Sequence, residues 1–264
     1  MISALILLLQ RELQDRFPSP WALCGEVGMI SLGLAIYWYT SQSFTSLTGN
    51  YFNYLVIGEL TLFMPLLLLQ GILRVIKTAL SEGTFEVFLV MPRRSQTPLI
   101  CLSLAAALRD GLSALLIGSI AVIGFRFRVP LSFLWDALYL QLLSLPLFFG
   151  LGLLSASILI RFGRGESVIV HLSTLASILA GVYFPITVLP ASFQALSQWL
   201  SPYSLLLQNT RTILEQGWNP AEHLKPTLLL GLGGLTFLTL GYIALGSSLA
   251  ALRRDGLPLA LRSR

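Results

Sequence analysis

The sequence predicts an all-α membrane protein, and three observations lead to that fold class. First, 55% of the 264 residues are hydrophobic and only 11% are charged, whereas soluble domains carry about 25% charged residues. Second, six apolar stretches are each long enough to supply the roughly 20 helical residues that cross a bilayer core. Third, continuous apolar runs favour helices over the short alternating strands of a membrane barrel. The stretches cover residues 22–40, 52–76, 99–124, 132–160, 166–184 and 226–250.

Residues 1–17 precede the first apolar stretch and are too charged after Leu9 to cross a membrane. Apolar residues recur at every fourth position of this segment: Leu5, Leu9, Leu13 and Phe17. This spacing is typical of an amphipathic helix that lies in the membrane interface, and Pro18 ends it. We expect the helix either to anchor the chain on the cytoplasmic side or to shape access to a pathway. Little chain remains outside these segments, so residues 1–264 are predicted to form a single transmembrane domain.

Basic residues are divided unevenly between the two sides that six crossings define. Six crossings place both termini on one side, and most Lys and Arg residues fall there. The opposite side keeps Arg126, Arg128, Arg211 and Lys225, and Arg109 is assigned to neither. Because cytoplasmic loops carry the basic excess, both termini are predicted in the cytoplasm, with the chain in the cell (inner) membrane. The net charge of +5 then reflects topology, and no nucleic-acid partner is expected.

The segment between the second and third stretches, residues 78–94, is amphipathic. Phe85 belongs to its apolar side, and Glu82 and Glu86 belong to its charged side. Ser81 is suited to cap a helix whose first turn carries Glu82, next to the positive end of the helix dipole. The segment is either a plain cytoplasmic loop or a helix that docks into a groove of a partner protein.

Residues 185–225 form a long segment between the fifth and sixth stretches. Prolines interrupt it at four positions: Pro185, Pro190, Pro202 and Pro220. Apolar residues follow helical spacing within it: Phe193, Leu196, Trp199 and Leu200. Its aromatic residues suit the headgroup level of a membrane. We expect two short helices that dip into the outer leaflet, where they form part of a pathway or only anchor the chain.

Two strings on opposite sides of the predicted membrane carry a family resemblance. On the cytoplasmic side, Glu82-Gly83-Thr84-Phe85-Glu86 is followed by Pro92. On the outer side, the fifth apolar stretch passes into GVYFPITVLPASFQALSQWLSPYSLLLQNTRTIL, residues 181–214. The first string resembles the coupling helix of ABC-2 type permeases, the membrane subunits of ABC exporters. The second is similar to the fifth helix and external loop of the same family. Their order across six spans extends the resemblance over nearly the whole chain.

The resemblance implies ATP-driven export by alternating access. Separate ATPase subunits would hold ATP and Mg and push on residues 82–86, and a second copy or a homologous permease would complete the membrane part. Cargo would leave through an outer gate at Tyr183, Phe184 and Pro185. Because no stretch resembles a pocket dense in charge, we expect an amphipathic, hydrophobic or lipid-linked cargo.

The sequence lacks the motifs of a catalytic or nucleotide-binding chain. Neither of its two lysines follows a glycine, so neither completes the G-x-x-x-x-G-K-S/T loop that cradles phosphates. Neither of its two histidines forms a recognisable pair with a nucleophile. No histidine or carboxylate stands at ligand spacing from either cysteine. We expect no enzyme activity, no cofactor and no metal in this chain, and ATP and Mg on its partner.

Glu59 lies inside the second apolar stretch. A charge at the bilayer centre costs at least about 2.5–3.5 kcal/mol, so a functional role is the default expectation. Glu59 either contacts substrate or couples a proton, or it pairs with a basic group such as Arg126 or Arg128. We favour the pairing.

Small and polar residues share one face of the fifth stretch. They recur at every third or fourth position: Ser167, His171, Thr174, Ser177 and Gly181. Such a face permits close contact between helices. Packing within the subunit, a seam between subunits and a wall of the transport path all fit this pattern.

Two other function classes remain open at the level of sequence. One is a dimeric secondary carrier in which Glu59 or His171 couples a proton to transport. The other is a membrane scaffold that transports nothing. ATP dependence separates the exporter from both, because the carrier responds to the proton gradient and the scaffold moves no cargo.

Overall fold

The computed structural model describes residues 20–43, 51–86, 96–162 and 166–255. Within these ranges the secondary structure is helical and no strand occurs. The interfacial helix predicted for residues 1–17 and the part of the docking segment after Glu86 lie outside the described residues.

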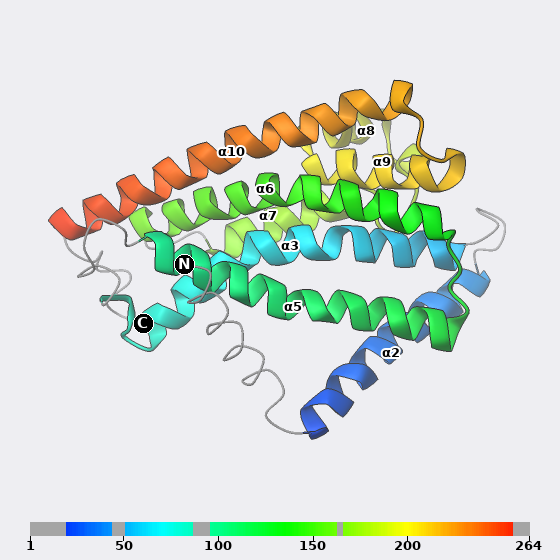
Figure 1. The fold of residues 1–264 in the computed structure, drawn as a ribbon, viewed down its shortest axis with the longest axis horizontal. Helices are drawn as coiled ribbons and strands as arrows, with labels where there is room; N and C mark the ends of the chain where they lie inside the picture. The colour runs from blue at the N-terminus through cyan, green and yellow to red at the C-terminus, as the bar shows by residue number, and fades with distance from the viewer. Residues whose placement is uncertain (1–19, 44–50, 87–95, 163–165, 256–264) are drawn as a thin grey trace.

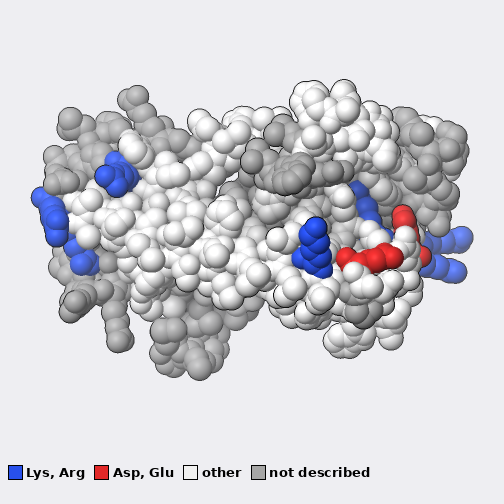
Figure 2. Space-filling model, turned by 90° about the horizontal axis from the view of Figure 1, so that it is seen from above, with Lys and Arg blue, Asp and Glu red and all other residues white. Residues whose placement is uncertain are grey.

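Five of the described helices are long and apolar enough to cross a membrane. They are α2 (Pro20–Ser43), α3 (Tyr51–Ser81), α5 (Gln96–Phe125), α6 (Leu131–Phe162) and α10 (Pro220–Asp255). All but α2 run roughly along the long axis of the molecule, and α2 crosses it obliquely (Figure 1). On the face shown in Figure 2, charged side chains gather toward the two ends and leave an uncharged band between them. The chain is therefore a multi-pass membrane protein built from helices.

The fifth apolar stretch forms a shorter helix than the other stretches. Helix α7 (Glu166–Leu179) has 14 residues, or about 21 Å of helical rise, which is less than the roughly 30 Å of a bilayer core. It ends before residue 184, where the apolar stretch ends, because Gly181 has a φ of 89° and turns the chain out of helical geometry.

Helices α6 and α10 run in the same direction, so the chain must cross back along the bundle after α6 and before α10. A Cβ added at Gly231 would lie 3.5 Å from Leu143, and the Ser248 hydroxyl donates to the carbonyl of Ser157 at 3.1 Å. Contacts therefore advance in the same direction along both helices, so α6 and α10 are parallel. The segment from α7 to Pro190 brings the chain back, and α7 lies against α3 and α6 (Figure 1).

Helix α6 is the centre of the core because glycines let both its neighbours approach closely. A Cβ added at Gly150 would lie 2.4 Å from the backbone of α10 at Leu238. A Cβ at Gly152 would lie 2.9 Å from the carbonyl oxygen of Leu68 in α3. Small residues at helix contacts permit the van der Waals packing that drives association in membranes.

Two short helices occupy the segment between α7 and α10, as the sequence predicts. A single 3₁₀ turn, η1 (Ile186–Val188), leads into α8 (Ala191–Leu200) and α9 (Pro202–Gln216). Ser201 caps α9 by accepting a hydrogen bond from the Ser204 N–H at 3.4 Å. Proline lacks a backbone N–H, and it fits the first position of α9 because an N–H there has no acceptor within the helix. These helices lie at the end of the bundle where α3 begins (Figure 1).

The prediction that Ser81 caps a new helix is wrong. Ser81 is the last residue of α3, and its hydroxyl donates back to the carbonyl of Thr78 at 2.9 Å. Residues 82–84 form a turn, and helical structure resumes at Phe85. Gly83 has a φ of 68°, a conformation that favours glycine, and it ends α3.

Candidate functional site

Arg211 of α9 joins the end of α7 to the start of α3. Its Nη1 donates to the Tyr54 hydroxyl at 2.6 Å and to the Gly181 carbonyl at 2.7 Å. Its Nη2 donates to the Val182 carbonyl at 3.2 Å and to the Tyr54 carbonyl at 3.3 Å. The guanidinium carbon lies 3.5 Å from the centre of the Tyr54 ring. A planar guanidinium suits several acceptors and an aromatic face at once. We call this cluster the Arg211 clasp.

Two glycines shape the clasp. Gly181 adopts the φ of 89° that turns the chain, and its carbonyl also accepts from the Tyr54 hydroxyl at 3.0 Å. Gly58 faces the guanidinium from α3, where an added Cβ would lie 3.0 Å from Nη2 of Arg211 and 3.0 Å from the Val182 carbonyl oxygen. The missing side chain at Gly58 therefore makes room for the arginine.

The charge of Arg211 is retained although the residue is largely buried. Burial lowers the pKa of the Arg211 guanidinium to about 10, while Tyr54 and Glu215 act in the opposite direction. A pKa of about 10 keeps the group protonated at neutral pH. The Nε atom is buried and has no hydrogen-bond partner among the described residues. The clasp is thus a cation held mainly by carbonyl oxygens and an aromatic ring.

The residues predicted as an outer gate follow directly after the clasp. The Tyr51 hydroxyl donates to the carbonyl of Tyr183, and the ring of Tyr51 stacks on Tyr54 with a centroid distance of 5.9 Å. The side chain of Tyr183 is 42% exposed. Phe184 is half-buried, and Pro185 precedes the 3₁₀ turn. The backbone of this turn is therefore fixed to α3, while the Tyr183 side chain points away from the core.

Glu59 pairs with a tyrosine rather than with the predicted basic group. The Tyr37 hydroxyl of α2 donates to Oε2 of Glu59 at 3.1 Å. The described residues give Glu59 no ion pair with Arg126 or Arg128. The loop between α5 and α6, which carries both arginines, is contacted by Asn53 instead: its side-chain amide donates to the carbonyl of Arg128 at 3.1 Å. The expected pairing is wrong because the Glu59 side chain lies against α2.

The small and polar face of the fifth stretch is split between exposed and buried positions. His171 and Thr174 are exposed, Ser177 is buried, and Gly181 lies beyond the end of α7 in the clasp. The side chain of Ser167 lies outside the described residues. The hydroxyls of Thr174 and Ser177 donate to carbonyls of their own helix at 2.9 and 2.7 Å. Close packing within the subunit therefore accounts for the Ser177 end of this face and not for the His171 end.

The segment Glu82–Glu86 lies at the other end of α3. Phe85 is only 1% exposed, whereas Glu82, Gly83, Thr84 and Glu86 are exposed. The Thr84 hydroxyl donates to the carbonyl of Ala79 at 3.3 Å. One buried ring thus fixes the turn to the bundle and leaves its two carboxylates facing outward. Beside it lies a recess of about 180 Å³, whose lining includes Arg74 and Arg109.

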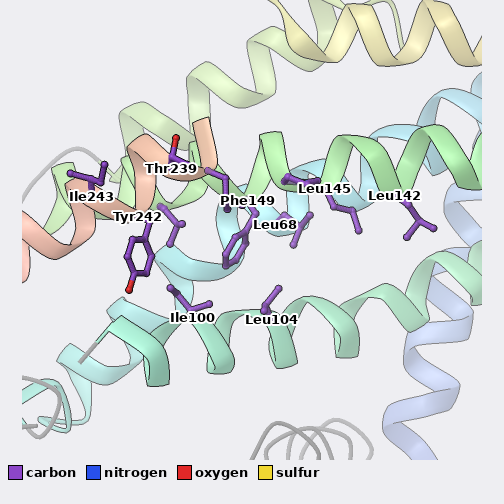
Figure 3. Close-up of a pocket in the computed structure, with 12 residues that line it drawn as sticks. Leu68, Ile100, Leu104, Leu142, Leu145, Phe149, Thr239, Tyr242 and Ile243 are labelled. Atoms are coloured by element: carbon purple, nitrogen blue, oxygen red, sulfur yellow. The ribbon is translucent and has the colours of Figure 1, made fainter. Parts of the chain in front are cut away.

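An apolar groove of about 780 Å³ opens between α5 and α10, with α6 and α3 behind it (Figure 3). Its lining contains no charged side chain. The residues that line it include Ile100, Leu104, Leu145, Phe149, Tyr242 and Ile243. Sequence reasoning missed this groove because four separate helices contribute to it.

A second missed feature joins α9 to α10. Nδ1 of His223 lies 2.5 Å from Oδ1 of Asn209, and both residues are buried. Trp218 stacks on the His223 ring with a centroid distance of 5.5 Å. This pair fixes the position of the helix that carries Arg211. The described residues contain no group of three or more His, Cys, Asp or Glu side chains that could hold a metal.

Comparison with known proteins gives no assignment. No family model matches the sequence, and no curated protein matches it. The resemblance to ABC-2 type permeases stays an expectation drawn from residues 82–86 and 181–214 and from their order along the chain.

Proposed function

We propose that this chain is the membrane subunit of an ATP-driven exporter of the ABC-2 type. The observation that carries the proposal is the position of the two family-like segments on α3. The clasp surrounds Tyr54 in the first turn of α3, and Glu82 directly follows its last residue, Ser81. A helix of 31 residues is about 46 Å long. One continuous helix therefore links a docking surface to a gate at the opposite end of the bundle.

In this proposal, six segments cross the membrane and both termini are cytoplasmic. Five long helices make five crossings, and α7 with the turn that follows it makes the remaining one. Two copies of the chain, or one copy and a homologous permease, assemble with separate ATPase subunits that hold ATP and Mg. The exposed face of α7 around His171 and Thr174 forms a subunit seam or a wall of the pathway.

In the proposed mechanism, α3 couples the two ends of the bundle. ATP-driven closure of the partner subunits moves the Glu82–Glu86 turn, and buried Phe85 transmits that motion to the end of α3. At the other end, Tyr54 and Gly58 move against Arg211 and loosen the turn at Tyr183, Phe184 and Pro185. Cargo with an apolar part then leaves near this turn. A membrane protein with an uncharged band and an apolar groove suits amphipathic, hydrophobic or lipid-linked cargo.

The test is ATP hydrolysis by the purified complex. The tagged full chain is isolated from its own host in mild detergent, and Mg·ATP hydrolysis that elutes with it is measured. Glu86→Arg reverses a charge on the docking surface and should lower the co-eluting activity by about tenfold or more, because like-charge contacts at an interface cost several kcal/mol. Glu222→Arg is the matched control, since Glu222 is an exposed acid at the opposite end of the bundle.

Two results contradict the proposal. One is a failure of the ATP hydrolysis test: either no hydrolysis elutes with the wild type, or Glu222→Arg lowers the co-eluting hydrolysis as much as Glu86→Arg does. The other is transport in vesicles that persists without ATP and collapses with the proton gradient, which identifies a secondary carrier.

A further inference from the structure

We propose that Glu59, Tyr37 and Tyr183 form a binding site for the cationic group of an organic cation. Glu59 comes from α3, Tyr37 from α2 and Tyr183 from the turn after α7. The inference deepens the proposed function by naming a cargo class, and it rests on that function only for the claim that the bound cation is exported.

The three side chains lie together at the edge of the clasp. The Tyr37 hydroxyl donates to Oε2 of Glu59 at 3.1 Å, and the Tyr183 side chain lies close enough to interact with Tyr37. Glu59 and Tyr37 are half-buried, and Tyr183 is 42% exposed. The carboxylate is therefore partly shielded and still accessible from outside the bundle.

Glu59 has no positive partner among the described residues. The nearby guanidinium of Arg211 is engaged with the carbonyls of Gly181 and Val182 and with the Tyr54 ring. The hydrogen bond that Glu59 receives comes from a neutral hydroxyl. A carboxylate inside a membrane span is expensive unless a partner compensates it. A bound cation supplies the charge that this subunit does not.

The two tyrosines near the carboxylate favour the same ligand, since the Tyr37 hydroxyl contacts Glu59 and the Tyr183 side chain interacts with Tyr37. The face of an aromatic ring attracts a cation, and the attraction increases when water is excluded. The protein already uses this geometry nearby, where the Arg211 guanidinium lies 3.5 Å from the centre of the Tyr54 ring. An anionic group at the same place meets the charge of Glu59.

The site is distinct from a second intramembrane carboxylate, Glu26. Glu26 accepts a hydrogen bond from the Ser113 hydroxyl at 2.8 Å, between α2 and α5. Glu26 therefore offers a control with the same chemistry in the same helix bundle.

The experiment compares two ions of the same shape and opposite charge. The full chain, with any partner that elutes with it, is placed in nanodiscs, and binding of tetraphenylphosphonium and tetraphenylborate is measured by equilibrium dialysis without ATP. Glu59→Gln keeps the size and hydrogen-bonding ability of the side chain and removes its charge. It should weaken tetraphenylphosphonium binding by about tenfold and leave tetraphenylborate binding unchanged or stronger. Glu59→Asp retains the charge and should retain most of the binding, and Glu26→Gln should have no effect.

Several outcomes overturn the site. Tetraphenylphosphonium binding that Glu59→Gln leaves intact removes the role of the carboxylate. An equal loss for both ions, or an equal loss in Glu26→Gln, shows a packing defect instead of cation recognition. A third outcome is that the wild type binds no cation and Glu59→Gln dissociates a dimer. Glu59 would then form an ion pair with a basic residue of a second copy. Because no ATP is present, these outcomes are independent of the ATP hydrolysis that tests the proposed function.

Discussion

Arg211 is the residue that decides where the chain turns back on itself. It lies 157 positions from Tyr54 and 30 from Gly181, and it holds both. A guanidinium is needed because several carbonyl oxygens and a ring face must be satisfied at one place. Without it, the Val182 carbonyl loses the donor that Arg211 supplies, and the Gly181 carbonyl keeps only the Tyr54 hydroxyl as a side-chain donor.

At this scale we expect Arg211→Lys to destabilise the protein. A lysine ammonium donates from a single point, so it cannot satisfy both carbonyls and also cover the Tyr54 ring. An unsatisfied buried carbonyl costs about 1–3 kcal/mol, which corresponds to an apparent Tm lower by roughly 2–12 °C. The apparent Tm is measured by tryptophan fluorescence while the protein is heated in detergent. Arg128→Lys changes an exposed arginine and serves as the control. Equal Tm values for the two variants would exclude a structural role for the clasp.

Helix α6 is the element on which the bundle is assembled. Gly150 brings α10 against it and Gly152 brings α3 against it, so two neighbours share one central helix. Pro146 lies within α6, next to Gly234 of α10. The closeness of these backbones depends on residues without side chains, since any Cβ at Gly150 enters the space of α10.

Gly150→Ala is expected to separate α6 from α10. The new methyl group would lie 2.4 Å from the backbone of Leu238, so the helices must move apart. Overpacking of this kind costs about 1–3 kcal/mol, and a lower apparent Tm reports it. Gly118→Ala is the matched control, because nothing lies within 4 Å of its added Cβ. Helix propensity favours alanine at that site. A Gly150→Ala protein as stable as Gly118→Ala would contradict this packing.

At the scale of the whole molecule, the described helices form an elongated bundle (Figure 1), and on the face shown in Figure 2 charged side chains gather toward its two ends. The ends differ in construction. One end carries the outward carboxylates of the Glu82–Glu86 turn. The other is closed by α8, α9 and the clasp (Figure 1).

Cysteine labelling tests the orientation that the charge distribution predicts. In a chain with Cys24 and Cys101 replaced by alanine, single cysteines are placed at Glu86, Glu215 and Arg254. The excess of basic residues predicts Glu86→Cys and Arg254→Cys on the cytoplasmic side and Glu215→Cys outside. A membrane-impermeant maleimide should label only Glu215→Cys in intact cells and the other two in inverted vesicles. Labelling of Arg254→Cys and Glu215→Cys from the same side would mean that α10 does not cross.

Local composition and spacing determined much of the architecture. Apolar stretches predict the five long helices, because burial in a membrane requires runs of apolar residues. Prolines and a glycine mark the breaks around α8 and α9, because these residues act on their own backbone. The capping predicted for Ser81 was wrong, because its hydroxyl donates to the carbonyl of Thr78 within α3.

Only the tertiary structure decided which residues meet. The tyrosine partner of Glu59, the apolar groove and the Arg211 clasp all join segments that are distant in sequence. In the sequence, Arg211 is one basic residue on the outer side, and Gly58 is one glycine in an apolar run. Periodicity shows which residues share a face of a helix. It does not show what that face will touch, because the contact depends on how separate helices pack.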